Sequence, residues 1–107
     1  MRYAIVLLLM NTAQPINAAG LTGHDVMRMC TTGQDACYWY LAGVHDAYQA
    51  ARARTEFNPT ICMDDDVTPD ALSNAFQSYL NDRLQQWHFD AGALALNAFQ
   101  KAWPCTR

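Results

Sequence analysis

Four cysteines constrain the fold of this 107-residue chain more than any other feature: Cys30, Cys37, Cys62 and Cys105. An even number of cysteines in a short exported chain is typical of a disulfide framework, and four cysteines can form two disulfides in three ways. No Cys-x-x-Cys pair occurs and the histidines are scattered, so neither a metal site nor a thiol redox motif is favoured. We therefore expect four structural cysteines and no metal or other cofactor.

Residues 1–19 have the order of a secretory signal peptide. A basic residue is followed by an apolar run at residues 4–10, a proline and small residues. The apolar run is far shorter than the roughly 20 residues of a membrane-spanning helix. A buried N-terminal helix or an uncleaved anchor is the alternative. We expect cleavage after Ala18 or Ala19, which leaves one domain over residues 20–107.

The composition indicates a small globular protein with a mildly acidic surface. Hydrophobic residues make up 51% of the chain, charged residues 16%, and the formal net charge is −3. With a single lysine there is no basic stripe for nucleic acid and nothing to hold an anionic membrane surface. A chain of this size buries only about 60–65% of its unfolded surface, so its core alone gives marginal stability.

The spacing of apolar residues predicts an all-α domain of four helices arranged as two helical hairpins. We expect the first helix at residues 21–30 and the second at about 34–54, where apolar residues recur every three or four positions. Thr32-x-x-Asp35 resembles a capping box that opens the second helix. Thr68-Pro69 is an N-cap followed by a proline, so the third helix begins there. A fourth helix follows a break and ends before Pro104.

The hairpins select one disulfide pairing. In one unbroken helix Cys30 and Cys37 would lie about 10 Å apart, which is too far for a disulfide. A break at Gly33 brings them within reach, and an antiparallel second hairpin places Cys105 near Cys62. We expect Cys30–Cys37 and Cys62–Cys105, which stabilise the chain by roughly 2.5 and roughly 4 kcal/mol in the chain-entropy model.

Two motifs suggest chemistry, and each has a simpler explanation. The adjacent pair His45-Asp46 is found on the catalytic helix of secreted phospholipases, but no glycine-rich calcium loop precedes it. Adjacent helical residues also point about 100° apart, so we expect a polar helix flank. The acidic run Asp64–Asp66 lacks the central glycine and the twelfth-position glutamate of an EF-hand, since that position is Ala75. It predicts a protruding acidic loop for a cationic partner. Because no nucleophile set appears either, we do not expect an enzyme.

Trp39 is the first candidate for an exposed contact or a dimer seam, because it lies off the apolar face of the second helix. Gly43 and Ala47, four residues apart, form a smooth strip that another helix can approach, although core packing explains that strip equally well.

With these residues in place, the chain resembles the Rap/Tai family of type VI secretion immunity proteins over roughly residues 21–105. The resemblance rests on the cysteine spacing and on these segments: Cys37-x-x-Tyr40-x-x-Gly43-x-x-Asp46, Tyr79-Leu80 and Trp103-Pro104-Cys105. Two loops depart from the family pattern, at Met63-Asp64 and at Asn81-Asp82-Arg83, so the resemblance supports the fold more firmly than the partner.

The resemblance implies a periplasmic inhibitor: a homodimer that occludes the active cleft of a peptidoglycan amidase toxin. We hypothesise that the surface presented to the toxin is the loop at residues 55–67, including Glu56, Phe57 and Asp64–Asp66. The alternatives are a small periplasmic acid-stress chaperone, a secreted hydrolase, and a fold kept for another envelope-binding role.

Overall fold

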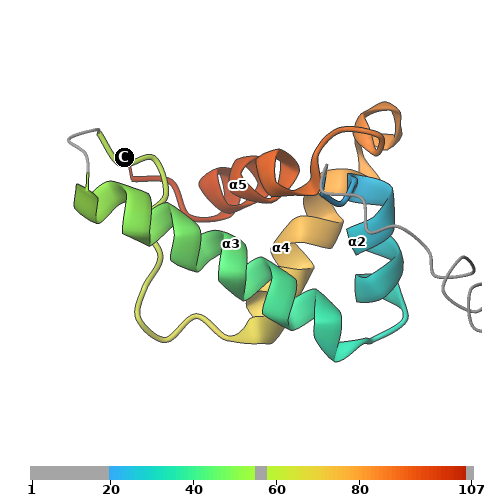
Figure 1. Cartoon of the computed structure of the whole chain (residues 1–107), viewed down its shortest axis with the longest axis horizontal. Helices are drawn as coiled ribbons and strands as arrows, with labels where there is room; N and C mark the ends of the chain where they lie inside the picture. The colour runs from blue at the N-terminus through green and yellow to red at the C-terminus, as the bar shows by residue number, and fades with distance from the viewer. Residues whose placement is uncertain (1–19, 55–57, 106–107) are drawn as a thin grey trace, which may run out of the picture.

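The computed structural model describes residues 20–54 and 58–105. Within these ranges there are four α-helices and one short 3-10 helix, and no strand (Figure 1): α2 at Gly23–Thr31, α3 at Asp35–Arg54, α4 at Pro69–Asn81, η1 at Leu84–Gln86 and α5 at Ala91–Ala102. The predicted all-α fold is confirmed. The predicted signal peptide and the residues Glu56 and Phe57 lie outside the described residues. In the part of the chain that the structure describes, no helix is long and apolar enough to span a bilayer.

Helix α2 begins with a reciprocal hydrogen-bonded cap. The Thr22 hydroxyl accepts the Asp25 N–H at 3.3 Å, and the Asp25 carboxylate accepts the Thr22 N–H at 3.0 Å. The backbone and side-chain hydrogen bonds from Thr22 lower the pKa of Asp25. The predicted capping box at Thr32 is wrong. Thr32 ends α2 instead, and its hydroxyl donates to the Arg28 carbonyl at 2.8 Å, so its side chain is not available to cap α3.

The turn between α2 and α3 confirms the first predicted disulfide. Gly33 has a φ of 70°, a left-handed conformation that glycine adopts without strain. This reversal places the Cα atoms of Cys30 and Cys37 4.9 Å apart, and the two residues are disulfide-bonded and buried. The disulfide therefore lies inside the core, between the end of α2 and the first turn of α3.

Helix α4 begins as predicted. The Thr68 hydroxyl accepts the Ala71 N–H at 3.2 Å, and Pro69 occupies the first turn. After α4 the chain folds back on itself, and the Trp87 indole N–H donates to the Leu80 carbonyl at 2.8 Å. This contact ties the segment after α4 back to the last turn of that helix.

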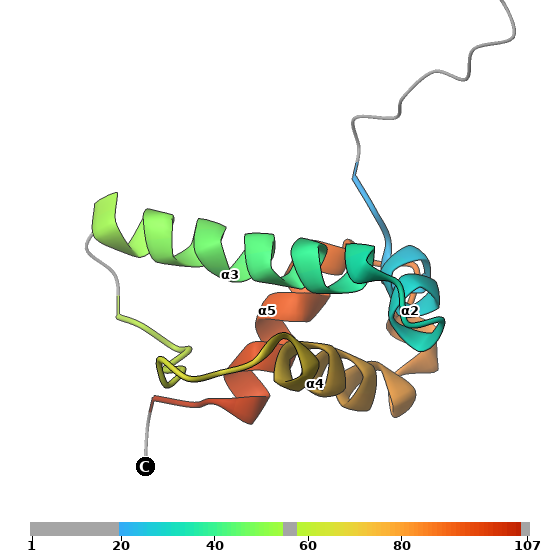
Figure 2. The same cartoon turned by 90° about the horizontal axis from the view of Figure 1, so that it is seen from below.

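The core lies where all four helices meet, and α5 packs against each of the other three (Figure 2). The largest fully buried side chains come from every helix: Val26, Cys37, Leu41, Phe76, Leu80, Leu94 and Phe99. The start of α2 is tied to the start of α5, because Gly23 N–H donates to the Phe89 carbonyl at 2.9 Å and Ala91 N–H to the Leu21 carbonyl at 2.8 Å. Burial of this shared apolar surface is the main force that stabilises the domain.

Helix α3 extends past this core. Its first half contributes the buried Cys37 and Leu41, whereas Val44 and Tyr48 are only half-buried and residues 49–54 are exposed. A helix of 20 residues is about 30 Å long, which exceeds the length of the helices beneath it. Figures 1 and 2 show this projecting end of α3 beside the chain that leads into α4.

Candidate partner-binding site

The segment that connects α3 to α4 is held at its base by Tyr48. We call its described part, residues 58–68, the tethered loop. The Tyr48 hydroxyl accepts the N–H groups of Thr60 at 3.0 Å and Ile61 at 3.2 Å. Burial opposes ionisation of Tyr48, but these donors outweigh burial, so the pKa of the phenol is lowered. The half of α3 that projects beyond the core therefore holds this loop through Tyr48.

The chain after α5 holds the same base from the other side. Ile61 is buried and forms an isolated antiparallel bridge with Pro104, and the Cys62 N–H donates to the Trp103 carbonyl at 2.8 Å. The second predicted disulfide, Cys62–Cys105, is confirmed and covalently closes this junction. Two hydrogen bonds to Tyr48, one hydrogen bond to Trp103, one bridge and one disulfide thus fix three consecutive loop residues.

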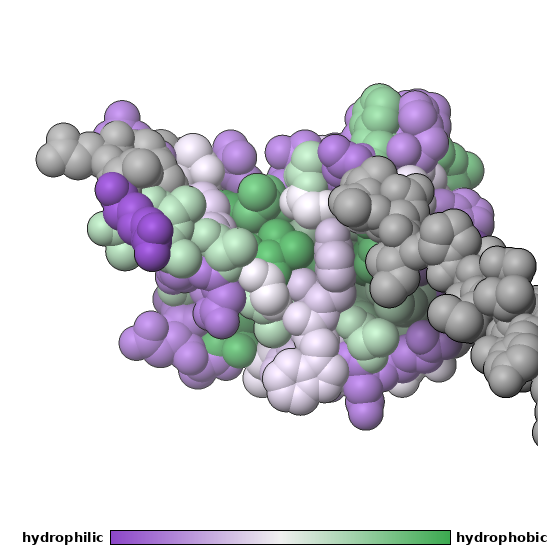
Figure 3. Space-filling model, viewed as in Figure 1, coloured by the Kyte–Doolittle hydropathy of each residue, from purple (hydrophilic) through white to green (hydrophobic). Residues whose placement is uncertain are grey.

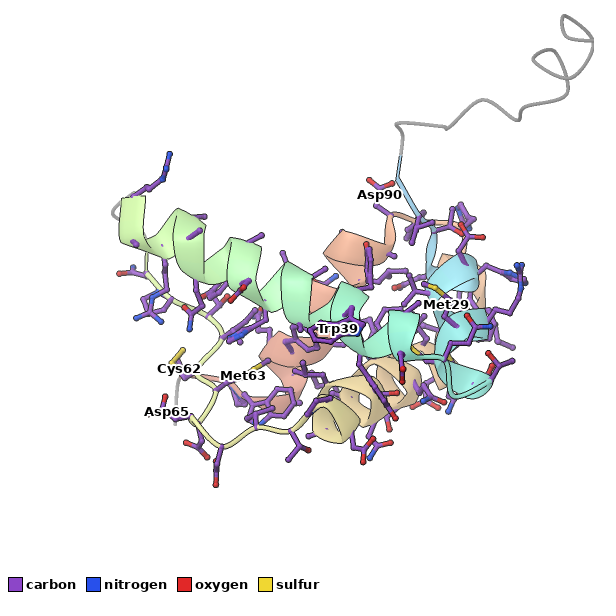
Figure 4. All side chains as sticks on the ribbon, turned by 60° about the horizontal axis from the view of Figure 1, so that its bottom comes forward. Met29, Trp39, Cys62, Met63, Asp65 and Asp90 are labelled. Atoms are coloured by element: carbon purple, nitrogen blue, oxygen red, sulfur yellow. A yellow bond between two sulfur atoms is a disulfide. The ribbon has the colours of Figure 1, made fainter. Side chains whose placement is uncertain are left out.

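The acidic tip of the loop, Asp64–Asp66, lies beyond this fixed base. All three aspartates are exposed, and the tip turns through a hydrogen bond from the Val67 N–H to the Asp64 carbonyl at 3.3 Å. Figure 4 shows Asp65 at the outer margin of the loop, beyond Cys62 and Met63. Among the described residues, no group of three or more His, Cys, Asp or Glu side chains is placed to hold a metal ion. The tip presents negative charge on a rigid support.

A recess of about 230 Å³ separates the acidic tip from α3. His45 and Gln49 line one wall, Asp64 and Asp65 the other, and apolar side chains including Leu72 form the floor. The His45 ring packs edge-on against Phe99, with ring centroids 6.5 Å apart. Asp46 is exposed, as expected of a polar flank, whereas His45 is half-buried and lies between Phe99 and the loop.

Trp39 lies on a different part of α3 and is the most exposed large hydrophobic residue among those described, at 77%. It borders a shallow recess of about 260 Å³ with Tyr38, Ala42 and Pro69. The Tyr38 hydroxyl donates to Asp70 at 2.8 Å, and this hydrogen bond raises the pKa of Tyr38 while linking α3 to the start of α4. The structure does not bring Trp39 together with the acidic tip: the two recesses have no lining residue in common.

The role of Tyr48 in holding the tethered loop was not predicted from the sequence. Its position on the apolar stripe of α3 predicted a core residue, and the side chain is indeed half-buried. Its partners lie 12 and 13 residues further along the chain, at a spacing that no local motif defines.

The comparisons with known proteins agree with this architecture. A model of Rap1a immunity proteins matches residues 22–105, from the N-cap of α2 to the last cysteine. The chain belongs to this family. Searches of curated proteins and of solved structures found no match. Membership of an immunity family implies a protein toxin as the partner, and the four helices and two disulfides described above all lie within the matched span.

Proposed function

We propose that this protein is exported to the periplasm after removal of residues 1–19 and there inhibits a peptidoglycan amidase toxin delivered by a type VI secretion system. The observation that carries the proposal, beside the family, is the tethered loop. Its base is fixed by Tyr48, the Pro104 bridge and the Cys62–Cys105 disulfide, while its acidic tip is exposed. A loop that is already ordered loses little conformational entropy on binding, which favours tight inhibition.

In this proposal the loop at residues 55–67 acts as a plug in the toxin cleft. The carboxylates of Asp64–Asp66 attract a basic rim around the cleft and accelerate association. Glu56 and Phe57 lie in the sequence between the end of α3 and the described part of this loop. An apolar side chain such as Phe57 then supplies the buried contact, and the acidic residues supply orientation.

A second part of the proposal is a homodimer formed through the outer face of α3. Trp39 is 77% exposed, and neighbouring Gly43 has nothing within 4 Å of the position that a Cβ atom would take. Figure 3 shows this face, on which pale and green residues occupy much of the middle and purple residues gather toward the margins. Exposed aromatic anchors beside small residues are typical of interfaces. Trp39→Ala should convert the dimer to a monomer in sedimentation experiments.

The decisive experiment is a pull-down with oxidised protein, expressed from the full chain, against a panel of peptidoglycan amidase toxins. We expect one amidase to be bound and its hydrolysis of peptidoglycan to be blocked. Changing Asp64, Asp65 and Asp66 together to Asn should weaken that binding about tenfold or more at low salt, because the charges that steer association are gone. Asp46→Asn, an exposed acidic residue of α3, is the matched control. Binding that is unchanged in the triple variant would remove the acidic tip from the interface.

A further inference from the structure

Three neighbouring concavities of about 480, 570 and 570 Å³ open along α4 and α5, and Tyr79 lines all of them. Lys101 is shared by the first and second, and Asn97 by the first and third. We call this surface the Tyr79 groove. From the level of Ala93 to the level of Ala102 it follows α5 for about 14 Å, the rise of nine helical residues.

The lining of the groove combines apolar surface with a few polar groups. Near the end of α5, both helices contribute alanines, and Trp103 and Tyr79 contribute aromatic surface. Asn74, Asn97 and Gln100 add amide groups that can bond to a backbone. Pockets with this mixture bind through apolar contact and fix orientation through their few polar groups.

Two cationic side chains, Arg83 and Lys101, line the second concavity. The Arg83 guanidinium lies 3.9 Å from the centre of the Tyr79 ring and donates to the Tyr79 carbonyl at 2.9 Å, so it is held in place before any ligand arrives. Lys101 is exposed on α5, a helix whose twelve residues include no acid. Asp82 is the one carboxylate among the described residues that line the first and second concavities. These two concavities therefore carry net positive charge, opposite to that of the acidic tip.

The groove begins at the base of the tethered loop. Pro59 and Thr60 line it together with Lys101 and Cys105, and Thr60 is one of the two residues held by Tyr48. A standard protein interface buries about 800 Å² on each partner and uses roughly 20–30 residues a side. The tethered loop is too short to supply that surface by itself, and the groove is continuous with it. A toxin bound to the loop would therefore also contact the groove.

We propose that the Tyr79 groove is a second docking site for the same toxin, and that it takes a segment in which a carboxylate lies beside an apolar side chain. The carboxylate binds Lys101 and Arg83, and the apolar side chain packs against Trp103 and the alanines of α4 and α5. The partner surface is then basic opposite the acidic tip and acidic opposite the groove, which fixes its orientation. This inference rests on the proposed toxin partner.

A peptide titration tests the groove without the toxin. The full chain, labelled with nitrogen-15, is titrated with a blocked pentapeptide that has glutamate between two leucines, and with a matched peptide that has lysine in place of glutamate. We expect amide shifts along the groove, at residues such as Asn74, Ser78 and Asn97, with the glutamate peptide, and affinity at least about threefold weaker with the lysine peptide. Equal response to both peptides, or no response along α4 and α5, overturns the proposed chemistry.

A charge reversal tests the groove against the toxin once the pull-down has identified it. Lys101→Glu should weaken toxin affinity about tenfold at low salt. Arg28→Glu, an exposed cation on α2 that does not line the groove, is the matched control and should change affinity less than about twofold. If Lys101→Glu binds like the parent while the acidic-tip variant loses affinity, the groove is not used and the immunity function stands. If no amidase binds the parent protein, the proposed function fails, and the peptide titration alone decides whether the groove recognises a carboxylate.

Discussion

The two disulfides close two different ends of the molecule, and their surroundings are opposite. Cys30 and Cys37 are 7 residues apart and almost wholly buried, with 7% and 1% of their surfaces exposed. Cys62 and Cys105 are 43 residues apart, and Cys62 is exposed. The first disulfide is part of the apolar core that the four helices share. The second joins the tethered loop to the chain after α5, beside the buried Ile61.

This difference shows that the molecule is ordered in two ways. In the helical core, order comes from burial: Gly23, at the start of α2, packs so closely that a Cβ atom there would lie 2.5 Å from Leu94 and 3.1 Å from the Trp87 carbonyl oxygen. At the loop end, order comes from specific bonds: the Tyr48 hydroxyl, the Pro104 bridge and the Cys62–Cys105 disulfide. Bonds of this kind fix a loop while leaving its tip exposed, which a binding surface requires.

The largest effect that we expect comes from removing the disulfides one at a time. Replacing Cys62 and Cys105 with alanine should cost about 4 kcal/mol of unfolding free energy, and replacing Cys30 and Cys37 about 2.5 kcal/mol, because the longer loop gains more entropy in the unfolded chain. Urea denaturation of both double variants measures the two values. The opposite order would show that packing around the buried disulfide contributes more than loop entropy.

Reduction kinetics give a second measure of the same contrast. A dithiol should reduce Cys62–Cys105 first, since Cys62 is exposed whereas both partners of the other disulfide are buried. Mass spectrometry after alkylation identifies the thiols that appear first. If the buried pair is reduced as fast, then α2 and α3 separate readily and the core at this end is looser than the packing implies.

A pair of glycine substitutions gives intermediate effects of opposite sign, one at the buried start of α2 and one at an exposed position in the middle of α3. Gly23→Ala should destabilise the protein by about 1–3 kcal/mol, because the added methyl group overpacks a site bounded by Leu94 and a backbone carbonyl. Gly43→Ala should stabilise it by up to about 1 kcal/mol, because this helical position has open space and alanine is the better helix former. Thermal unfolding of the two variants tests both signs. Stabilisation by Gly23→Ala would show that α2 shifts freely against α5.

The elements that the sequence predicted well are those governed by local rules. Apolar spacing located the helices, Thr68-Pro69 located the start of α4, and the break at Gly33 identified the Cys30–Cys37 pair. The capping box failed because Thr22 and Thr32 each precede an aspartate by three residues, and the pattern alone does not say which threonine begins a helix. The chain conformation decides it: Thr22 is extended, with a ψ of 167°, whereas Thr32 still follows the turn of α2, with a ψ of 3°.

The site was less accessible to sequence reasoning, because it depends on contacts between distant segments. The exposure of Trp39 and of the acidic tip followed from their positions on helix and loop. The inward position of His45 depends on Phe99 in α5, which is 54 residues away in sequence (99 − 45). The Tyr79 groove likewise exists only because α4 and α5 pack together, and neither helix shows it alone.

The smallest loss of stability should come from removing the hydroxyl that holds the tethered loop. Tyr48→Phe removes the acceptor for two backbone N–H groups, so we expect a loss of about 1 kcal/mol, with faster hydrogen exchange confined to the amides of Thr60 and Ile61. Tyr40→Phe is the matched control, because the half-buried Tyr40 hydroxyl on the same helix makes no hydrogen bond to the described residues. Toxin affinity should fall in Tyr48→Phe although no surface side chain has changed, since the loop must then be ordered on binding. Unchanged exchange at both amides would show that the disulfide and the Pro104 bridge hold the loop without α3.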